Sequence, residues 1–145
     1  MMAPLEGIRM LDLSRQLPGQ FCSSMLSNYG VEVITVLAPG DTYGLGQSTL
    51  SRNKKSLTLN LRMEEARKIF YRLAERSDIV LEGFRPGGAK RLGVDYESVK
   101  GLNPGLIYCS ISCYGQDGPY RDMPGFDLNC LGVAGILDIS TAPGS

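Results

Sequence analysis

The sequence lacks histidine, an excess of charge of either sign, and any long apolar run. Without histidine, a mixed cysteine–histidine metal site is excluded. No uncharged apolar run approaches the roughly 18 residues that a membrane-spanning helix needs, and the first residues lack the basic and then apolar order of a secretory leader. Basic and acidic residues number 15 each, so no overall field attracts nucleic acid or an anionic membrane. These absences predict a cytoplasmic protein that binds neither.

Four cysteines are the remaining candidates for a metal site: Cys22, Cys109, Cys113 and Cys130. Cys109 and Cys113 fall on one predicted strand, where residues four apart share a face but stand about 13 Å apart, too far to bind one ion. We therefore expect no metal site and interpret all four side chains as reduced, partly buried thiols.

The remaining composition is that of an ordinary globular protein. The 145 residues are 43% hydrophobic and 21% charged, which is enough apolar material for a core. We expect one domain over residues 1–145.

Apolar β-rich segments alternate with segments of helical periodicity. Strands are predicted at 7–14, 31–37, 56–61, 78–84 and 106–113. Helices are predicted at 18–29, 63–76 and 95–100, and from Asp127 onward through Ile136. This alternation predicts an α/β fold, with a mostly parallel Rossmann-like sheet and flanking helices.

One loop is the best candidate for an anion contact. The predicted strand 78–84 runs into Arg85-Pro86-Gly87-Gly88, in which proline fixes one backbone angle and the glycines allow conformations that a Cβ would block. Ligands of open α/β sheets bind at the carboxyl ends of the strands, and a guanidinium there suits a phosphate or a carboxylate.

Other basic residues cluster less distinctively. Arg52, Lys54 and Lys55 precede a predicted strand, and Lys90 and Arg91 follow the Arg85 loop. An alternative is that Lys54, Lys55 and Lys90 only form a solvated face. The glycine-rich loop 40–46 is neither a Walker A motif nor a GxGxxG turn directly after a strand, so we interpret it as a lid or surface loop.

Several short strings follow one another in a recognisable order. They read LEGI and LDLS between residues 5 and 14, RNKKSL at 52–57, EGFRPG at 82–87, RLG at 91–93, LNP at 102–104, YGQDGP at 114–119 and PGFD at 124–127. Together they cover nearly the whole chain and resemble the class III CoA-transferase family, which includes formyl-CoA transferase and α-methylacyl-CoA racemase. The resemblance implies that Phe84, Arg85, Arg91 and Lys55 or its neighbour Lys54 line a groove for coenzyme A.

The resemblance also implies an activity. Family members move CoA between an acyl-CoA thioester and a small carboxylic acid through an aspartyl intermediate, as homodimers or possibly hetero-oligomers. The family's catalytic aspartate lies in a glycine–aspartate motif downstream of residue 145, so we expect these residues to be the N-terminal part of the large domain, incomplete and inactive alone. No catalytic residue is assigned within them.

Phe126 separates two branches of this resemblance. In the racemase branch the residue before the aspartate of the PGFD-type motif is a histidine that moves a proton, and phenylalanine cannot hold one. Asp127 is interpreted as a helix N-cap. Two alternatives stay open. A 2-methylacyl-CoA racemase fits the compact spacing between the second predicted strand and the basic cluster, although it conflicts with Phe126, and a non-catalytic CoA-binding partner subunit would explain the departures at residues 35–38, Leu17 and Gly83.

Overall fold

A computed structural model describes residues 3–41 and 49–140. The chain divides into two compact units, Met1–Ile111 and Ser112–Ser145. In the described part, no helix has both the length and the apolar character needed to cross a membrane.

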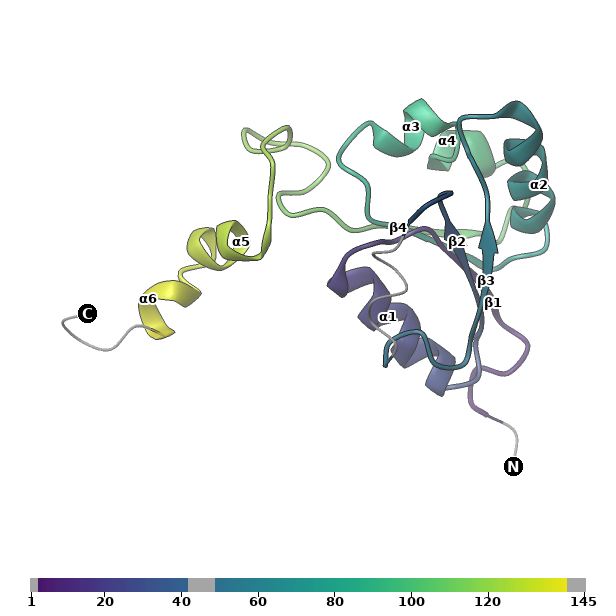
Figure 1. Cartoon of the computed structure of the whole chain (residues 1–145), viewed down its shortest axis with the longest axis horizontal. Coiled ribbons are helices and arrows are strands. Elements are labelled where there is room, and N and C mark those ends of the chain that lie inside the picture. The colour runs from purple at the N-terminus through teal and green to yellow at the C-terminus, as the bar shows by residue number, and fades with distance from the viewer. Residues whose placement is uncertain (1–2, 42–48, 141–145) are drawn as a thin grey trace. The chain divides into compact units, whose positions relative to one another are not determined.

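The first unit is built on a five-stranded sheet whose strands all run parallel (Figure 1). The strands are β1 Arg9–Asp12, β2 Glu32–Leu37, β3 Lys54–Thr58, β4 Ile79–Glu82 and β5 Ile107–Ser110. All five predicted strands are present, and the predicted α/β fold class is confirmed. β3 begins earlier than predicted, because Lys54 and Lys55 already pair with β2.

The strand order β3-β2-β1-β4-β5 creates a switch point between β1 and β4. From β1 the chain proceeds to β2 on one side, and after β3 it crosses back to place β4 on the other side. The loops that follow β1 and β4 therefore diverge and leave a crevice at the carboxyl ends of these strands, where sheets of this kind bind ligands.

Helices cover both faces of the sheet (Figure 1). They are α1 Leu17–Asn28 on one face, and α2 Glu64–Ala74, α3 Gly88–Leu92 and α4 Tyr96–Val99 on the other. Alternate strand residues serve the two cores, since Met10 and Leu81 pack toward α1 whereas Leu11 and Val80 pack with Phe70 of α2. Because both faces are covered, consecutive residues of these strands are apolar: Met10 and Leu11 in β1, and Ile79, Val80 and Leu81 in β4.

The fully buried residues of helix α1 are small or polar, and Cys22 and Leu26 are partly buried against the core beside them. Gly19, Ser23 and Ser27 are buried, whereas Phe21 and Met25 are 53% and 44% exposed. Phe21, Met25 and Tyr29, the apolar residues spaced by four that identify this helix in the sequence, therefore lie on its outer face. Small residues on the inner face let the helix backbone approach the sheet closely.

The second unit contains helices α5 Asp127–Val133 and α6 Ile136–Ser140. The single helix predicted from Asp127 is interrupted at Gly135, whose φ of 74° ends the helical conformation. Asp127 is the first helical residue rather than the N-cap, and the preceding residue, Phe126, donates its N–H to Asn129 Oδ1 at 3.1 Å.

A disulfide joins Cys113 to Cys130 within this unit. The prediction of four reduced thiols is therefore wrong for this pair and holds for Cys22, which is partly buried, while Cys109 is free but exposed. The error has a physical reason. β5 ends at Ser110, so Cys113 lies beyond the strand, and pairing with a residue 17 positions away leaves no local pattern in the sequence.

Candidate functional site

A cavity of about 160 Å³ lies at the carboxyl ends of the strands in the first unit. Its wall combines segments that follow four different strands: Leu13 after β1, Ala38 after β2, Leu61 after β3 and Phe84 after β4. The cavity therefore occupies the crevice that the strand order creates beside the switch point.

Polar groups enter this apolar cavity from three loops. Arg15, Asp41, Asn60 and Arg62 all contribute to its lining. Arg15 Nε lies 2.6 Å from Asp41 Oδ2, so one guanidinium is held by a carboxylate whose side chain is only 2% exposed. Over residues 3–41 and 49–140, the guanidinium of Arg62 forms no hydrogen bond or ion pair. The site offers apolar walls and a cation still able to bind an anion.

The Arg85 loop forms one rim of this site. Gly87 adopts φ of 77°, in the left-handed region that favours glycine, and a Cβ at Gly88 would lie 2.8 Å from the Phe84 Cβ. Both glycines are therefore required by the turn that follows β4. Phe84 lines the cavity, while Arg85 and Arg91 are exposed beside it.

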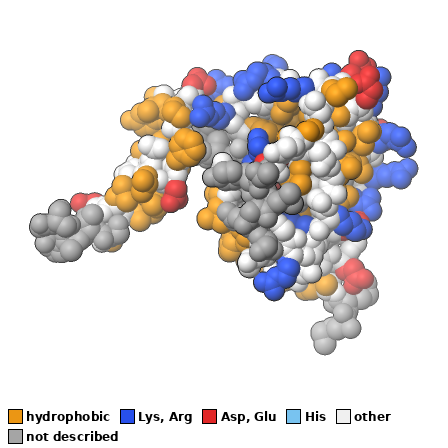
Figure 2. Space-filling model, in the orientation of Figure 1, with side chains coloured by type: hydrophobic (Ala, Val, Ile, Leu, Met, Phe, Trp, Pro, Cys, Tyr) orange, Lys and Arg blue, Asp and Glu red, His pale blue; other side chains and the backbone are white. Residues whose placement is uncertain are grey.

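The buried carboxylate of Glu82 also shapes this loop. Its Oε2 accepts the N–H of Phe84 at 2.6 Å, which folds the chain back directly after β4. Arg91 extends back from α3 toward the glycine turn, because its Nη1 would lie 3.5 Å from a Cβ at Gly87. Lysine and arginine side chains gather over α3 on the surface (Figure 2). The structure thus places Phe84, Arg85 and Arg91 close together at the turn after β4.

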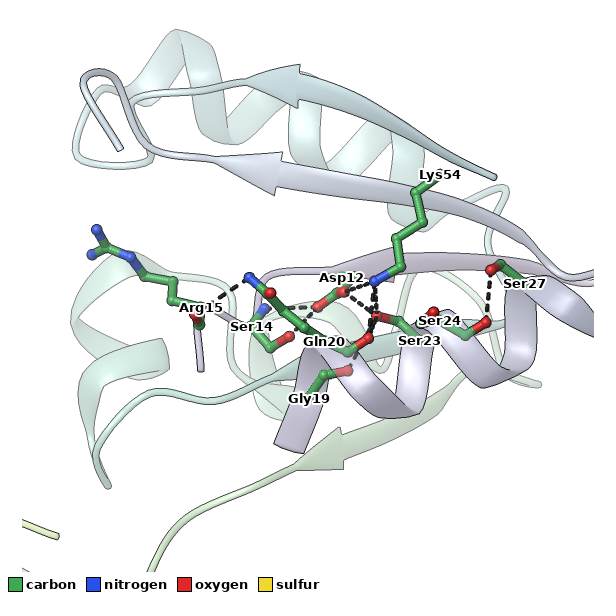
Figure 3. Close-up of polar contacts among 9 residues, drawn as sticks. All are labelled: Asp12, Ser14, Arg15, Gly19, Gln20, Ser23, Ser24, Ser27 and Lys54. Atoms are coloured by element: carbon green, nitrogen blue, oxygen red, sulfur yellow. Dashed lines mark hydrogen bonds and ion pairs between the residues drawn. The ribbon is translucent and has the colours of Figure 1, made fainter. Parts of the chain in front are cut away.

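Lys54 is placed differently (Figure 3). It begins β3, and its side chain reaches toward α1, where Nζ donates to Ser23 Oγ at 2.7 Å and to Gln20 O at 3.0 Å. Its side chain is 5% exposed, and its Nζ lies 3.8 Å from the buried Asp12 Oδ2. Burial lowers the pKa of Lys54, and the charge of Asp12 opposes that shift. Lys54 is not among the residues that line the cavity.

Lys55 also lies at the amino end of β3, whereas the cavity lies at the carboxyl ends of the strands. Its Nζ lies 2.5 Å from Glu32 Oε1, and Arg9 Nε lies 2.6 Å from Glu32 Oε2. The hydrogen bond from Lys55, followed by that from Arg9, lowers the pKa of Glu32. These contacts link β1, β2 and β3 at the edge opposite the cavity. Neither predicted lysine is brought to the cavity with Phe84.

The polar residues of the cavity wall were not among the site residues predicted from the sequence. Arg15, Asp41, Asn60 and Arg62 each follow a strand by two to four residues. That position after a parallel strand was the available signal, because the carboxyl ends of all strands converge at one edge. The predicted lid or surface loop at 40–46 lies mostly outside the described residues. The structure describes Gly40 and Asp41 of this segment.

Comparisons with known proteins identify the family of this chain. The sequence model of CoA-transferase family III matches residues 5–145 of this chain. The chain is 40% identical to succinyl-CoA–D-citramalate CoA-transferase of Chloroflexus aurantiacus, over 97% of this chain and 38% of that protein. It is 38% identical to the human α-methylacyl-CoA racemase, over 92% of this chain and 34% of the racemase.

A solved structure supports the same relationship. The crystal structure of a CAIB/BAIF family protein from Brucella suis matches with a TM-score of 0.91 and 35% identity. The match covers 100% of this chain and 43% of that one. The chain thus spans well under half the length of the relatives that it matches.

Proposed function

This chain belongs to CoA-transferase family III, and we propose that it forms the CoA-binding part of an enzyme that moves CoA from an acyl thioester to a carboxylic acid. The proposed small-molecule partners are an acyl-CoA and a small carboxylic acid. A homodimer or a hetero-oligomer remains a prediction from the family resemblance, and a cytoplasmic location remains a prediction from the composition of the sequence.

The observation that carries the proposal is the composition of the cavity and its rim. Coenzyme A has a flat adenine and several phosphates at one end, so a site for that end needs apolar walls beside cations. The cavity supplies Leu61 and Phe84 as apolar wall and Arg15 and Arg62 as cations. Guanidinium groups suit phosphate because they donate two parallel hydrogen bonds.

The size of the cavity limits what it encloses. At about 160 Å³ it is smaller than the roughly 300–1,000 Å³ of pockets that enclose a whole drug-sized ligand. We therefore place only the adenine end of CoA at this site, with the adenine between the apolar walls and its phosphates between the cations of the cavity, Arg15 and Arg62, and those of the rim, Arg85 and Arg91. Lys54 and Lys55, which the resemblance also implies, lie away from this path.

The proposed chemistry is covalent. It uses an aspartate that is not assigned to any of residues 1–145. The aspartate carboxylate attacks the thioester carbonyl, and the carbon–sulfur bond breaks. CoA thiolate departs, and a mixed anhydride between the aspartate and the donor acid forms. The thiolate then attacks the aspartyl carbonyl, which frees the donor acid and gives an aspartyl thioester. The acceptor carboxylate attacks the carbonyl of the aspartyl thioester and displaces CoA thiolate, which gives a second mixed anhydride. The thiolate then attacks the acceptor acyl carbonyl, which gives the new acyl-CoA and releases the aspartate carboxylate. The residues of this chain hold CoA within reach of the aspartate throughout, because loss of the thiolate to solvent would end the reaction.

The test is a transfer assay on the full-length protein. An unlabelled acyl-CoA is incubated with a panel of ¹⁴C-labelled carboxylic acids, and labelled acyl-CoA is expected for at least one of them. Hydroxylamine should trap the activated aspartyl carbonyl only when acyl-CoA is present. CoA binding without transfer to any acid would instead support the non-catalytic partner subunit.

Racemisation is the second candidate, because one relative of this chain is a 2-methylacyl-CoA racemase. Exchange of the proton next to the thioester needs two groups that can each hold a proton, on opposite faces of the carbon. Phe126 supplies none at the position that the resemblance singles out. We expect little deuterium to enter a 2-methylacyl-CoA in deuterated water. Fast exchange without acid-dependent transfer would favour a racemase with another base.

A further inference from the structure

The turn between β1 and α1 carries Arg15 to the cavity, and a buried carboxylate shapes that turn. We propose that Asp12 is a positioning residue that fixes Arg15 for the ligand, and this inference rests on the proposed CoA site. Asp12 is fully buried at the last position of β1. Ionised groups are rarely buried without a role or a partner, so each of its contacts needs an account.

One oxygen of Asp12 holds the turn itself. Oδ1 accepts the backbone N–H of Ser14 at 2.8 Å and the Ser14 hydroxyl at 2.5 Å. These bonds fold the chain back directly after the strand ends. The next residue, Arg15, points away from the network in Figure 3 and lines the cavity. There its Nε forms an ion pair with Asp41 Oδ2 at 2.6 Å.

The other oxygen of Asp12 is held from α1 and β3. Ser23 Oγ donates to Oδ2, and Lys54 Nζ, which donates to Ser23 Oγ, balances the carboxylate charge from 3.8 Å. The carboxylate therefore cannot rotate without breaking contacts to three segments of the chain. Lys54 therefore supports the carboxylate that sets the turn and does not contact the ligand.

Helix α1 restrains the turn from its other side. Gln20 Nε2 donates to the carbonyl of Arg15 at 3.3 Å, and a Cβ at Gly19 would overlap the Ser14 side chain. Residues on both sides of Arg15 are thus fixed by hydrogen bonds or close packing. A long side chain held in this way loses less freedom when it binds a ligand, and this preorganisation improves affinity.

The neighbouring strand, β4, also ends in a buried carboxylate that accepts a backbone N–H of the following turn. Glu82 ends β4 beside β1, is buried, and accepts the N–H two residues further along, as Asp12 does. That turn leads to Phe84 and Arg85. Two adjacent strands therefore end in carboxylates that fold the following loops toward one crevice, which a purely structural role at one strand would not explain.

The first experiment needs no ligand. In the full-length wild-type protein, the Ser14 amide should exchange with deuterium slowly, at least about 100-fold below its intrinsic rate, because Asp12 Oδ1 accepts it. Asp12→Ala should release segment 13–18, while Asp12→Asn, which keeps an oxygen for that N–H, should protect it. A Ser14 amide that exchanges at its intrinsic rate in the wild type would overturn the inference without any variant.

The second experiment measures CoA binding by calorimetry in a double-mutant cycle. Asp12→Ala and Arg15→Ala should each raise the dissociation constant about 10-fold, and the double variant should show no further increase, because Asp12 acts through Arg15. Asp12→Asn should bind within about twofold of the wild type. Ser77→Ala is the matched control, since it removes a buried hydroxyl bond at the opposite end of β4 and should lower stability but not affinity.

The outcomes separate the inference from the proposed function. Multiplicative losses in the double variant, or an equal loss in Asp12→Asn, would contradict a positioning role while leaving the CoA site intact. If the wild type binds no CoA, the proposed function fails, and the exchange measurement still decides whether Asp12 holds the turn.

Discussion

Arg85 is the exposed residue on which the proposed CoA site depends most directly. Its guanidinium has no partner within the part of the chain that the structure describes, so it is available to a phosphate. Arg85→Ala in the full-length protein should weaken CoA binding by about 1.5–3 kcal/mol, the usual contribution of a charge-assisted hydrogen bond. Calorimetry with free CoA measures this. Arg72→Ala, an exposed change on α2, should leave the affinity unchanged, and an equally small effect at Arg85 would remove it from the site.

Glu32 makes stability depend on pH. Its pKa is lowered from the ordinary 4.5 by the hydrogen bonds from Lys55 and Arg9. The folded protein therefore binds the proton less readily than the unfolded chain, so the stabilisation is present above about pH 4.5 and is lost as pH falls through the lower, folded pKa. Since the pair is partly exposed, we expect about 0.5–1 kcal/mol.

The measurement for Glu32 is urea unfolding at several pH values between 3 and 7. Glu32→Gln should lower the free energy of unfolding at pH 7 and leave it nearly unchanged at the acid end. High salt should reduce the difference, because the charges are solvent-accessible. A loss of stability in Glu32→Gln that is the same at every pH would show that the charge is not the cause.

At the scale of elements, α1 shows that an apolar stripe does not always mark the buried face of a helix. Ser27 packs against the sheet and is 8% exposed, while the adjacent Asn28 is exposed. Ser27→Leu should lower the free energy of unfolding by about 1–3 kcal/mol, because the added atoms do not fit a close helix–sheet contact.

Asn28→Leu is the matched change on the outer face of α1, and it should alter stability by less than about 0.5 kcal/mol. Thermal or urea unfolding of the full-length variants compares the two. If Ser27→Leu were neutral, or if Asn28→Leu were the costlier change, the assignment of the inner face of α1 would be wrong.

At the scale of the molecule, much apolar surface is exposed. In the second unit Leu128, Val133 and Ile139 are 70%, 65% and 85% exposed, and α5 buries none of its own residues. In the first unit the outer face of α1 adds Phe21 and Met25. Such surface promotes association unless something covers it.

We therefore predict that residues 1–145, expressed alone, aggregate or bind a hydrophobic dye. Light scattering and dye fluorescence measure this, and the full-length protein is the control, which should show neither. A monodisperse 145-residue monomer that unfolds cooperatively and ignores the dye would instead show that these residues form a self-contained domain.

The sequence was sufficient for the five strands and for the turn after β4, but it predicted neither α3 nor the break between α5 and α6. Alternating periodicities predict all five strands and the α/β class, because each pattern depends on residues that are close in the chain. The Arg85 loop was also predictable, since proline and glycine restrict or extend the local backbone conformations directly. In these cases the cause is local, so the sequence records it.

Only the tertiary structure decided where distant residues meet. It joins Arg15, Asn60 and Arg62 in one cavity, because the strand order brings the ends of β1 and β3 to the same edge. It also separates Lys54 from that cavity and directs its side chain toward α1 and Asp12, although both are charged residues expected at a surface. Charge alone indicates a solvated or ligand-binding side chain, whereas burial and pairing depend on contacts between segments far apart in the sequence.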